Sequence, residues 1–425
     1  MKTEEISFKA INVNPFLQGA RSFIAMQEGG NGLSHTRFLQ NTTIGIAPKA
    51  TFARSKADLC ESIFLEVTEG FLLYYGPVLL GEKLLRGIYS KNLSENLKNM
   101  VSKPATELLK TPSAANKRLL PVKAALALSF MAIPLGQFVT TFAKNLFTLK
   151  LFKQGNFDNI ANLDKSKKID EETNKRVEKS AYKNIKRAIA VYGACLAASA
   201  LLLVKGKNSK LLQHLSELVL APGTKLFKNG TKKAEFFNKY FSLDFKDNNG
   251  KLAHSIGQLM PCALIGGSGY LMAARDRGKQ NFLETLSTVP LMALYLLFGN
   301  ELLETGFKKL LLRNGKCKDL INDKLEVVSM ENLEGFAKKL SGQKGVEFKQ
   351  MYNKLLKQKI FISGVPLVLG IGVMGFFMAG MSRFFTKMRY NHAQKRRQEQ
   401  KNTQVKTDFA FKALKKAKPF SNFAF

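Results

Sequence analysis

The sequence predicts an all-α fold: a polytopic membrane bundle of about six helical spans, with helical loops and a basic C-terminal tail. The chain has 425 residues, and its apolar residues gather into six segments that charged stretches separate. None of the 66 Lys and Arg residues falls inside those segments. A soluble basic protein would seldom confine every cation to such gaps, so a membrane bundle is favoured over a soluble domain with buried core helices.

Four of the segments are good candidates for membrane-spanning helices by their length and lack of charge. A helix needs about 20 mostly apolar residues to cross a bilayer. Lysine and arginine stand directly beside several of these segments, as expected where a helix leaves the lipid. The four candidate spans are 124–143, 188–204, 255–274 and 360–382.

The other two segments, 63–81 and 282–303, are weaker candidates because each carries two glutamates. In the second, the uncharged centre between Glu284 and Glu301 is too short to cross a bilayer alone. This segment can span only if both carboxylates lie at the interfaces with water. Its two acids would then mark the ends of the helix.

Prolines and glycines inside the spans indicate a closely packed bundle. Small residues let helix backbones approach one another in lipid. Proline removes a backbone N–H, so it is expected to kink a helix and free a carbonyl. The prolines concerned are Pro134, Pro261, Pro290 and Pro366. Such kinks occur in transporters and in ordinary membrane helices alike, so they indicate no activity.

The charge distribution divides the chain into three regions around the spans. A polar N-terminal segment, which lacks the pattern of a secretory signal, precedes the multi-span domain, and a basic juxtamembrane tail follows it. Within the domain, basic helical loops connect the spans. The boundaries are 1–62 for the N-terminal segment, 63–382 for the membrane domain, 144–187, 205–254 and 304–359 for the basic helical loops, and 383–425 for the tail.

The orientation of the bundle rests on two local features. Basic residues are almost equally numerous on the two sides of a six-span model, so their count does not decide the matter. The short basic connection 275–281 and the tail fall on the same side as the N-terminus. Short basic loops stay in the cytoplasm. We therefore expect an integral protein of the inner or plasma membrane of a bacterium, with both termini cytoplasmic.

Three acidic residues are candidates for an intramembrane site: Glu66, Glu69 and Glu284. Glu66 and Glu69 lie one helical turn apart and share a face. Acids at membrane depth are costly and are often functional, for example in binding a transported cation or proton. The alternative is that these residues mark helix starts and contact water among the head groups.

A weak internal repeat is a further hypothesis. Aligned without gaps, residues 64–89 and 282–307 are identical at eight of 26 positions, five of which are leucine. Similar short basic sequences precede the two segments, ARSK at 53–56 and ARDR at 274–277. Spans one and two would then repeat as spans five and six, which is one plan of secondary transporters. Coincidence within leucine-rich sequence is the alternative.

The start of the tail is a candidate contact for anionic lipid. Basic residues next to a span attract anionic head groups. Nucleic acid is disfavoured as a partner because no RNP, KH, zinc or helix-turn-helix signature stands beside this cluster. An acidic protein is the other partner class that would fit the charge. The candidate lipid contacts are Arg383, Lys387, Arg389, Lys395, Arg396 and Arg397.

The sequence carries no signature of catalysis. The Walker loop, GxSxG, HExxH and a convincing Rossmann fingerprint are absent, and the four cysteines form no CxxC pair. We therefore expect no catalytic residue, cofactor or metal site. The function predicted first is a membrane-anchored scaffold or interaction protein with affinity for anionic lipid. The alternatives are a transporter or channel built on the repeat, and a soluble helical protein that binds nucleic acid; the oligomeric state stays open.

Overall fold

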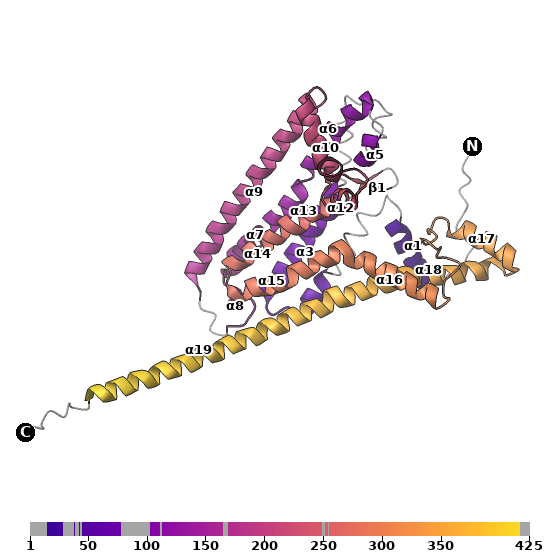
Figure 1. Cartoon of the computed structure of the whole chain (residues 1–425). Coiled ribbons are helices and arrows are strands. Elements are labelled where there is room, and N and C mark those ends of the chain that lie inside the picture. The colour runs from indigo at the N-terminus through magenta and orange to yellow at the C-terminus, as the bar shows by residue number, and fades with distance from the viewer. Residues whose placement is uncertain are drawn as a thin grey trace, which may run out of the picture.

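The computed structural model describes residues 15–28, 38, 42, 45–77, 103–110, 113–164, 169–248, 251–253 and 255–416. Within these ranges the chain is overwhelmingly α-helical, as the sequence predicts (Figure 1). The strands found there are β1 (Lys246–Asn248) and β2 (Lys251–Ala253), which pair antiparallel. This short hairpin lies inside the predicted helical loop 205–254.

The helices before β1 include the central helices of the bundle and some at its outside. They are α1 (Pro15–Glu28), α3 (Lys56–Pro77), α5 (Ala105–Lys110), α6 (Ala114–Ser129), α7 (Ala132–Phe152), α8 (Phe157–Ile160), α9 (Glu171–Lys205), α10 (Lys210–Leu220), α11 (Pro222–Leu226) and α12 (Lys232–Tyr240).

In the second half, three long helical stretches contain π-helical turns. The elements are α13 (Ile256–Pro261), the π-turn η4 (Cys262–Gly266), α14 (Gly267–Asp276), α15 (Lys279–Leu294), the π-turn η5 (Tyr295–Gly299), α16 (Asn300–Arg313), α17 (Leu333–Lys344), α18 (Phe348–Gly370), the π-turn η6 (Ile371–Phe377) and α19 (Met378–Lys416).

Among the described residues, four helices are long and apolar enough to cross a membrane: Arg118–Phe152, Glu171–Lys205, Lys279–Gly299 and Phe348–Lys412. They contain or overlap the predicted spans 124–143, 188–204, 282–303 and 360–382. The other two predicted spans are not among them. Segment 63–81 is helical over 63–77 within α3, while 78–81 lies outside the described residues. Segment 255–274 forms α13, η4 and most of α14.

One of the four long helices lies at the centre of the bundle and three lie at its outside. In Arg118–Phe152, 72% of the most apolar stretch is buried, against 17% for Glu171–Lys205, 6% for Lys279–Gly299 and 18% for Phe348–Lys412. The central helix packs against α3, α9 and α14. Its Ala124, Ala125 and Leu126 are fully buried. The outer helices therefore present apolar surface away from the protein.

The four prolines have two different effects on the helices. Pro134 stands in the first turn of α7, after a break at residues 130–131, where its missing N–H costs nothing. Pro261, Pro290 and Pro366 stand inside helices, and each is followed within a few residues by a π-turn. A widened turn accommodates the helix register that a proline disturbs.

A second core lies at the end of the bundle where α16, α17 and the start of α18 meet. Leu333, Leu355 and Leu356 are fully buried there, and α1 adds Ile24 to the same cluster. The guanidinium of Arg21 in α1 stands 5.7 Å from the centre of the Tyr352 ring. At the opposite end of the molecule, α19 leaves the bundle as a single projecting helix (Figure 1).

Phe38 and the helical residues 45–51 contact α3 at two places. The Phe38 ring lies 5.3 Å from that of Tyr75, near the end of α3. Lys49 pairs with Glu66, closer to the start of α3. The contact of Lys49 thus lies nearer the start of α3 than the contact of Phe38.

Candidate functional site

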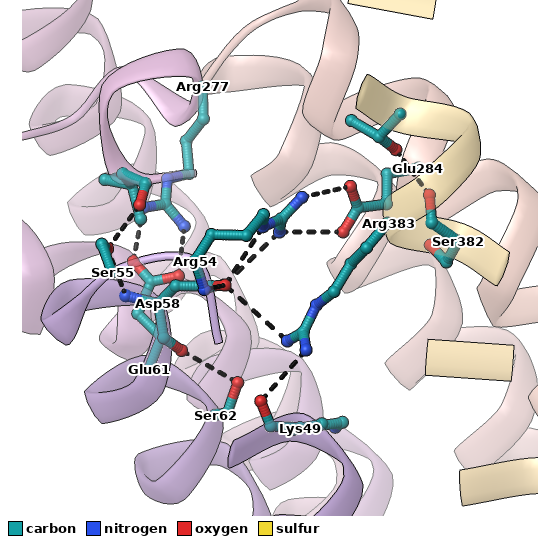
Figure 2. A network of polar contacts seen from close by, with 12 residues as sticks. Lys49, Arg54, Ser55, Asp58, Glu61, Ser62, Arg277, Glu284, Ser382 and Arg383 are labelled. Carbon is teal, nitrogen blue, oxygen red and sulfur yellow. Dashed lines mark hydrogen bonds and ion pairs between the residues drawn. The ribbon is translucent and has the colours of Figure 1, made fainter. Parts of the chain in front are cut away.

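Charged side chains gather at the end of the bundle where α3 and α15 begin and α14 ends (Figure 2). These positions directly flank the apolar segments in the sequence, so alternating helices bring them to one level. We call this group the polar network: Lys49, Arg54, Ser55, Asp58, Glu61, Arg277, Glu284 and Arg383.

Arg54 joins the start of α3 to the start of α15. Its Nη1 lies 2.9 Å from Oε2 of Glu284 and its Nη2 lies 3.1 Å from Oε1, a forked pair with two parallel hydrogen bonds. Its Nε also donates to Oδ2 of Asp58 at 3.1 Å. Beneath it, the ring of Phe157 lies 5.0 Å from the guanidinium carbon. One cation thus holds two carboxylates that come from different helices.

Arg277 and Glu61 form the most deeply buried ion pair of the network. The side chain of Arg277 is 1% exposed and that of Glu61 is 8% exposed. Nη1 of Arg277 donates to Oε2 of Glu61 at 3.0 Å, and the hydroxyl of Thr148 in α7 donates to Oε1. The pair therefore fastens α3, α7 and the connection after α14 to one another.

Arg383 closes the network from the side of α19. Its Nη1 donates to the carbonyl oxygen of Lys49 at 3.0 Å, and its Nη2 lies 3.7 Å from Oδ2 of Asp58. The sequence indicated this residue as a lipid contact, but here it has protein partners. Lys387, Lys395, Arg396 and Arg397 are exposed along α19, whereas Arg389 is half-buried and donates to the hydroxyl of Thr386. Their contact with lipid stays a prediction.

The three predicted acids have different hydrogen-bonding partners. Glu284 belongs to the network through Arg54. Glu66 pairs with Lys49, whose carbonyl oxygen accepts from Arg383. Glu69 lies one turn further along α3 and accepts a hydrogen bond from the hydroxyl of Tyr270 in α14. Two of the three acids are thus neutralised by a protein cation.

Ion pairing keeps the carboxylates at the start of α3 charged. Burial alone would raise the pKa of Asp58, but the charges of Arg54 and Arg383 outweigh it and lower that pKa below its ordinary value. Burial also acts to raise the pKa of Glu61, and the charges of Arg277 and Lys144 again lower it. Both groups are therefore ionised at neutral pH and are unsuited to exchanging protons there.

The sequence reasoning missed Arg54, Asp58, Glu61 and Arg277. A usable signal was present, because all four stand just outside apolar segments, where charges from successive helices must meet in an antiparallel bundle. Among the described residues no group of three potential metal ligands is found. Cys60, Cys195, Cys262 and Cys317 are free thiols.

Neither a known protein family, nor a curated protein, nor a solved structure matches this chain. Its function is therefore inferred from its own geometry alone.

Proposed function

We propose that this protein is a multi-pass integral membrane protein that acts as a non-enzymatic, membrane-anchored scaffold with affinity for anionic lipid. The outward apolar faces of three long helices carry this proposal. On α9, Ile189, Val191, Leu196, Leu201 and Val204 are all exposed. Soluble monomers rarely present such continuous apolar surface to water, and a bilayer would cover it.

The polar network supports six passes. The network joins the start of α3 to the end of α7 and to the start of α15. The neighbouring hydrogen bond between Ser180 and Asp276 adds the start of α9 and the end of α14. Arg383, just after the last apolar run, belongs to the same end. Successive helices therefore run alternately away from this end and back, as six antiparallel spans would.

The packing of α1 bears on the orientation of the bundle. Because α1 packs on α18 in the second core, it lies at the end of the bundle away from Arg383. We propose that the tail and the connection 275–281 face the cytoplasm, with α1 packed at the opposite end of the bundle. The expectation that both termini are cytoplasmic stays a prediction, since residues 1–14 and 417–425 lie outside the described residues.

The paired acids favour a scaffold over a transporter. A carboxylate that couples to ion movement must exchange its partner, whereas Glu66 and Glu284 are each held by a protein cation. Glu69 is the exception, since it accepts a hydrogen bond from the neutral hydroxyl of Tyr270. This contact between α3 and α14 keeps transport as a second candidate. Cation or proton flux into liposomes that Glu69→Gln abolishes would support it, and flux equal to that of empty liposomes would remove it.

Extraction and cysteine labelling test the membrane proposal. The protein should stay in the membrane pellet at alkaline pH in carbonate, and its release would refute an integral protein. In a variant lacking native cysteines, single cysteines would replace exposed lysines and be labelled with an impermeant maleimide. Cysteine at Lys175, Lys279 or Lys401 should label from one side, and at Lys207 or Lys316 from the other. A four-span bundle would instead leave Lys207 and Lys279 on the same side.

A further inference from the structure

A cationic groove of about 280 Å³ lies between α9 and α14, beside the polar network. Five of its lining residues are basic and one is acidic. The lining is Arg176, Lys179, Ser180, Lys183, Asn184, Arg187, Met272, Arg275 and Asp276. We propose that this groove binds the phosphate head group of an anionic lipid. The inference rests on the proposed membrane location and names the site of the lipid affinity.

The cations of α9 share one face of the helix. Arg176, Lys179, Lys183 and Arg187 follow one another at intervals of three or four residues, which stacks their side chains along the groove. Lys179, Lys183 and Arg187 have no hydrogen bond or ion pair to any residue that the structure describes. By contrast, Arg176 donates to the carbonyl oxygen of Asp276 at 3.1 Å. The groove therefore holds charge that an external anion could neutralise.

The walls of the groove are fixed before any ligand arrives. Asp170 caps α9 by accepting from the backbone N–H of Thr173 at 2.9 Å. Asn145 of α7 donates to the carbonyl oxygen of Ala273 in α14 at 3.0 Å, and Ala273 and Ala181 are buried together in one cluster. A preformed spacing between α9 and α14 lowers the entropy cost of binding.

The surroundings of the groove favour a lipid over other anions. Directly after Arg187, α9 enters its apolar stretch, where Ile189 and Val191 are exposed. A phosphate held by Lys183 and Arg187 would leave acyl chains beside this apolar face. Nucleic acid or free phosphate would use the cations and gain nothing from the apolar side. In the orientation proposed above, the groove lies at the cytoplasmic surface, where anionic lipids concentrate.

The test measures binding of a fluorescent phosphatidylglycerol to the full-length protein in maltoside micelles by fluorescence polarisation. One variant replaces Lys179, Lys183 and Arg187 with glutamine. The matched control replaces Lys175, Lys186 and Lys205, which lie on the same helix and outside the groove lining. Each basic residue near the surface contributes about 1 kcal/mol, so the groove variant should lose affinity by roughly 100-fold. The control should bind within about threefold of the wild type.

Competitors separate the sources of the phosphate. Unlabelled phosphatidylglycerol should displace the probe, while phosphatidylcholine, inorganic phosphate and a single-stranded oligonucleotide at equal concentration should not. Stronger displacement by phosphate or by the oligonucleotide would overturn the lipid assignment. Equal binding by the groove variant and the control would overturn the groove. Circular dichroism and gel filtration would show that both variants are folded.

Carbonate extraction of the same proteins distinguishes the two proposals. If the wild type stays in the membrane but the groove variant binds lipid normally, only the groove inference fails. If the wild type is released by carbonate and still shows groove-dependent lipid binding, the integral-membrane proposal fails and the groove stands.

Discussion

Removal of the Arg277 guanidinium tests whether the polar network holds the bundle together. In Arg277→Met, Glu61 would keep the hydrogen bond from Thr148 but lose both bonds from Arg277. Because the Glu61 side chain is only 8% exposed, water cannot replace the lost partner without opening the structure. The variant leaves a buried carboxylate without its main counter-charge.

The structure sets the expected size of the effect. Breaking a buried ion pair by removing one partner costs about 3–5 kcal/mol, which is about a 1000-fold change in the folding equilibrium. The exposed pair of Lys150 and Glu178, with side chains 63% and 39% exposed, provides a matched control. Lys150→Met deletes a cation from the same end of α7 and should produce no measurable change, since exposed pairs are screened by water.

The assay is reversible unfolding in mixed micelles of maltoside and SDS, followed by circular dichroism. Arg277→Met should unfold at a much lower SDS fraction than the wild type or Lys150→Met. The double variant Arg277→Met with Glu61→Gln should regain most of the loss, because the uncompensated charge is gone. A free energy of unfolding for Arg277→Met equal to that of Lys150→Met would refute the network as a structural clamp.

Two further predictions concern acid and close packing. The folded pKa values of Asp58 and Glu61 lie below their ordinary values of 3.8 and 4.5. Their contribution to stability is therefore complete above about pH 5 and is lost as the pH falls. The double variant Asp58→Asn with Glu61→Gln should show a flatter dependence of the free energy of unfolding on pH in the same assay. The same pH dependence in the wild type and the double variant would contradict this. A Cβ added at Gly257 would clash with the carbonyl oxygen of Ser242, so Gly257→Ala should cost roughly 1–3 kcal/mol. A Cβ at Gly193 meets nothing within 4 Å, so Gly193→Ala should be neutral or slightly stabilising. Equal SDS midpoints of unfolding for the two variants would exclude the close contact.

The sequence predicted the long helices better than it predicted the site. Apolar runs bounded by lysine and arginine identify a helix locally, so four predicted spans reappear as long apolar helices. Ion pairs are not local: Arg54 and Glu284 are 230 positions apart, and Arg277 and Glu61 are 216 apart. Nothing in one sequence tells which flanking charges meet. The pairing of β1 with β2 could have been predicted, because the sequence Asn249-Gly250 is a strong signal for a hairpin turn. The prediction of a helical loop over 205–254 did not use this signal.

The contacts across the network also bear on the hypothesis of an internal repeat. Arg54 stands before α3 and binds Glu284 of α15, while Arg277 stands before α15 and binds Glu61 of α3. Such an exchange is what two copies related by an axis along the bundle would produce. The ungapped alignment pairs Glu284 with Glu66, five residues beyond Glu61, so the exchanged pairs are not equivalent positions. The two helices therefore share one arrangement, in which an arginine just before each helix pairs with a glutamate of the other. An origin of the two segments by duplication stays a prediction.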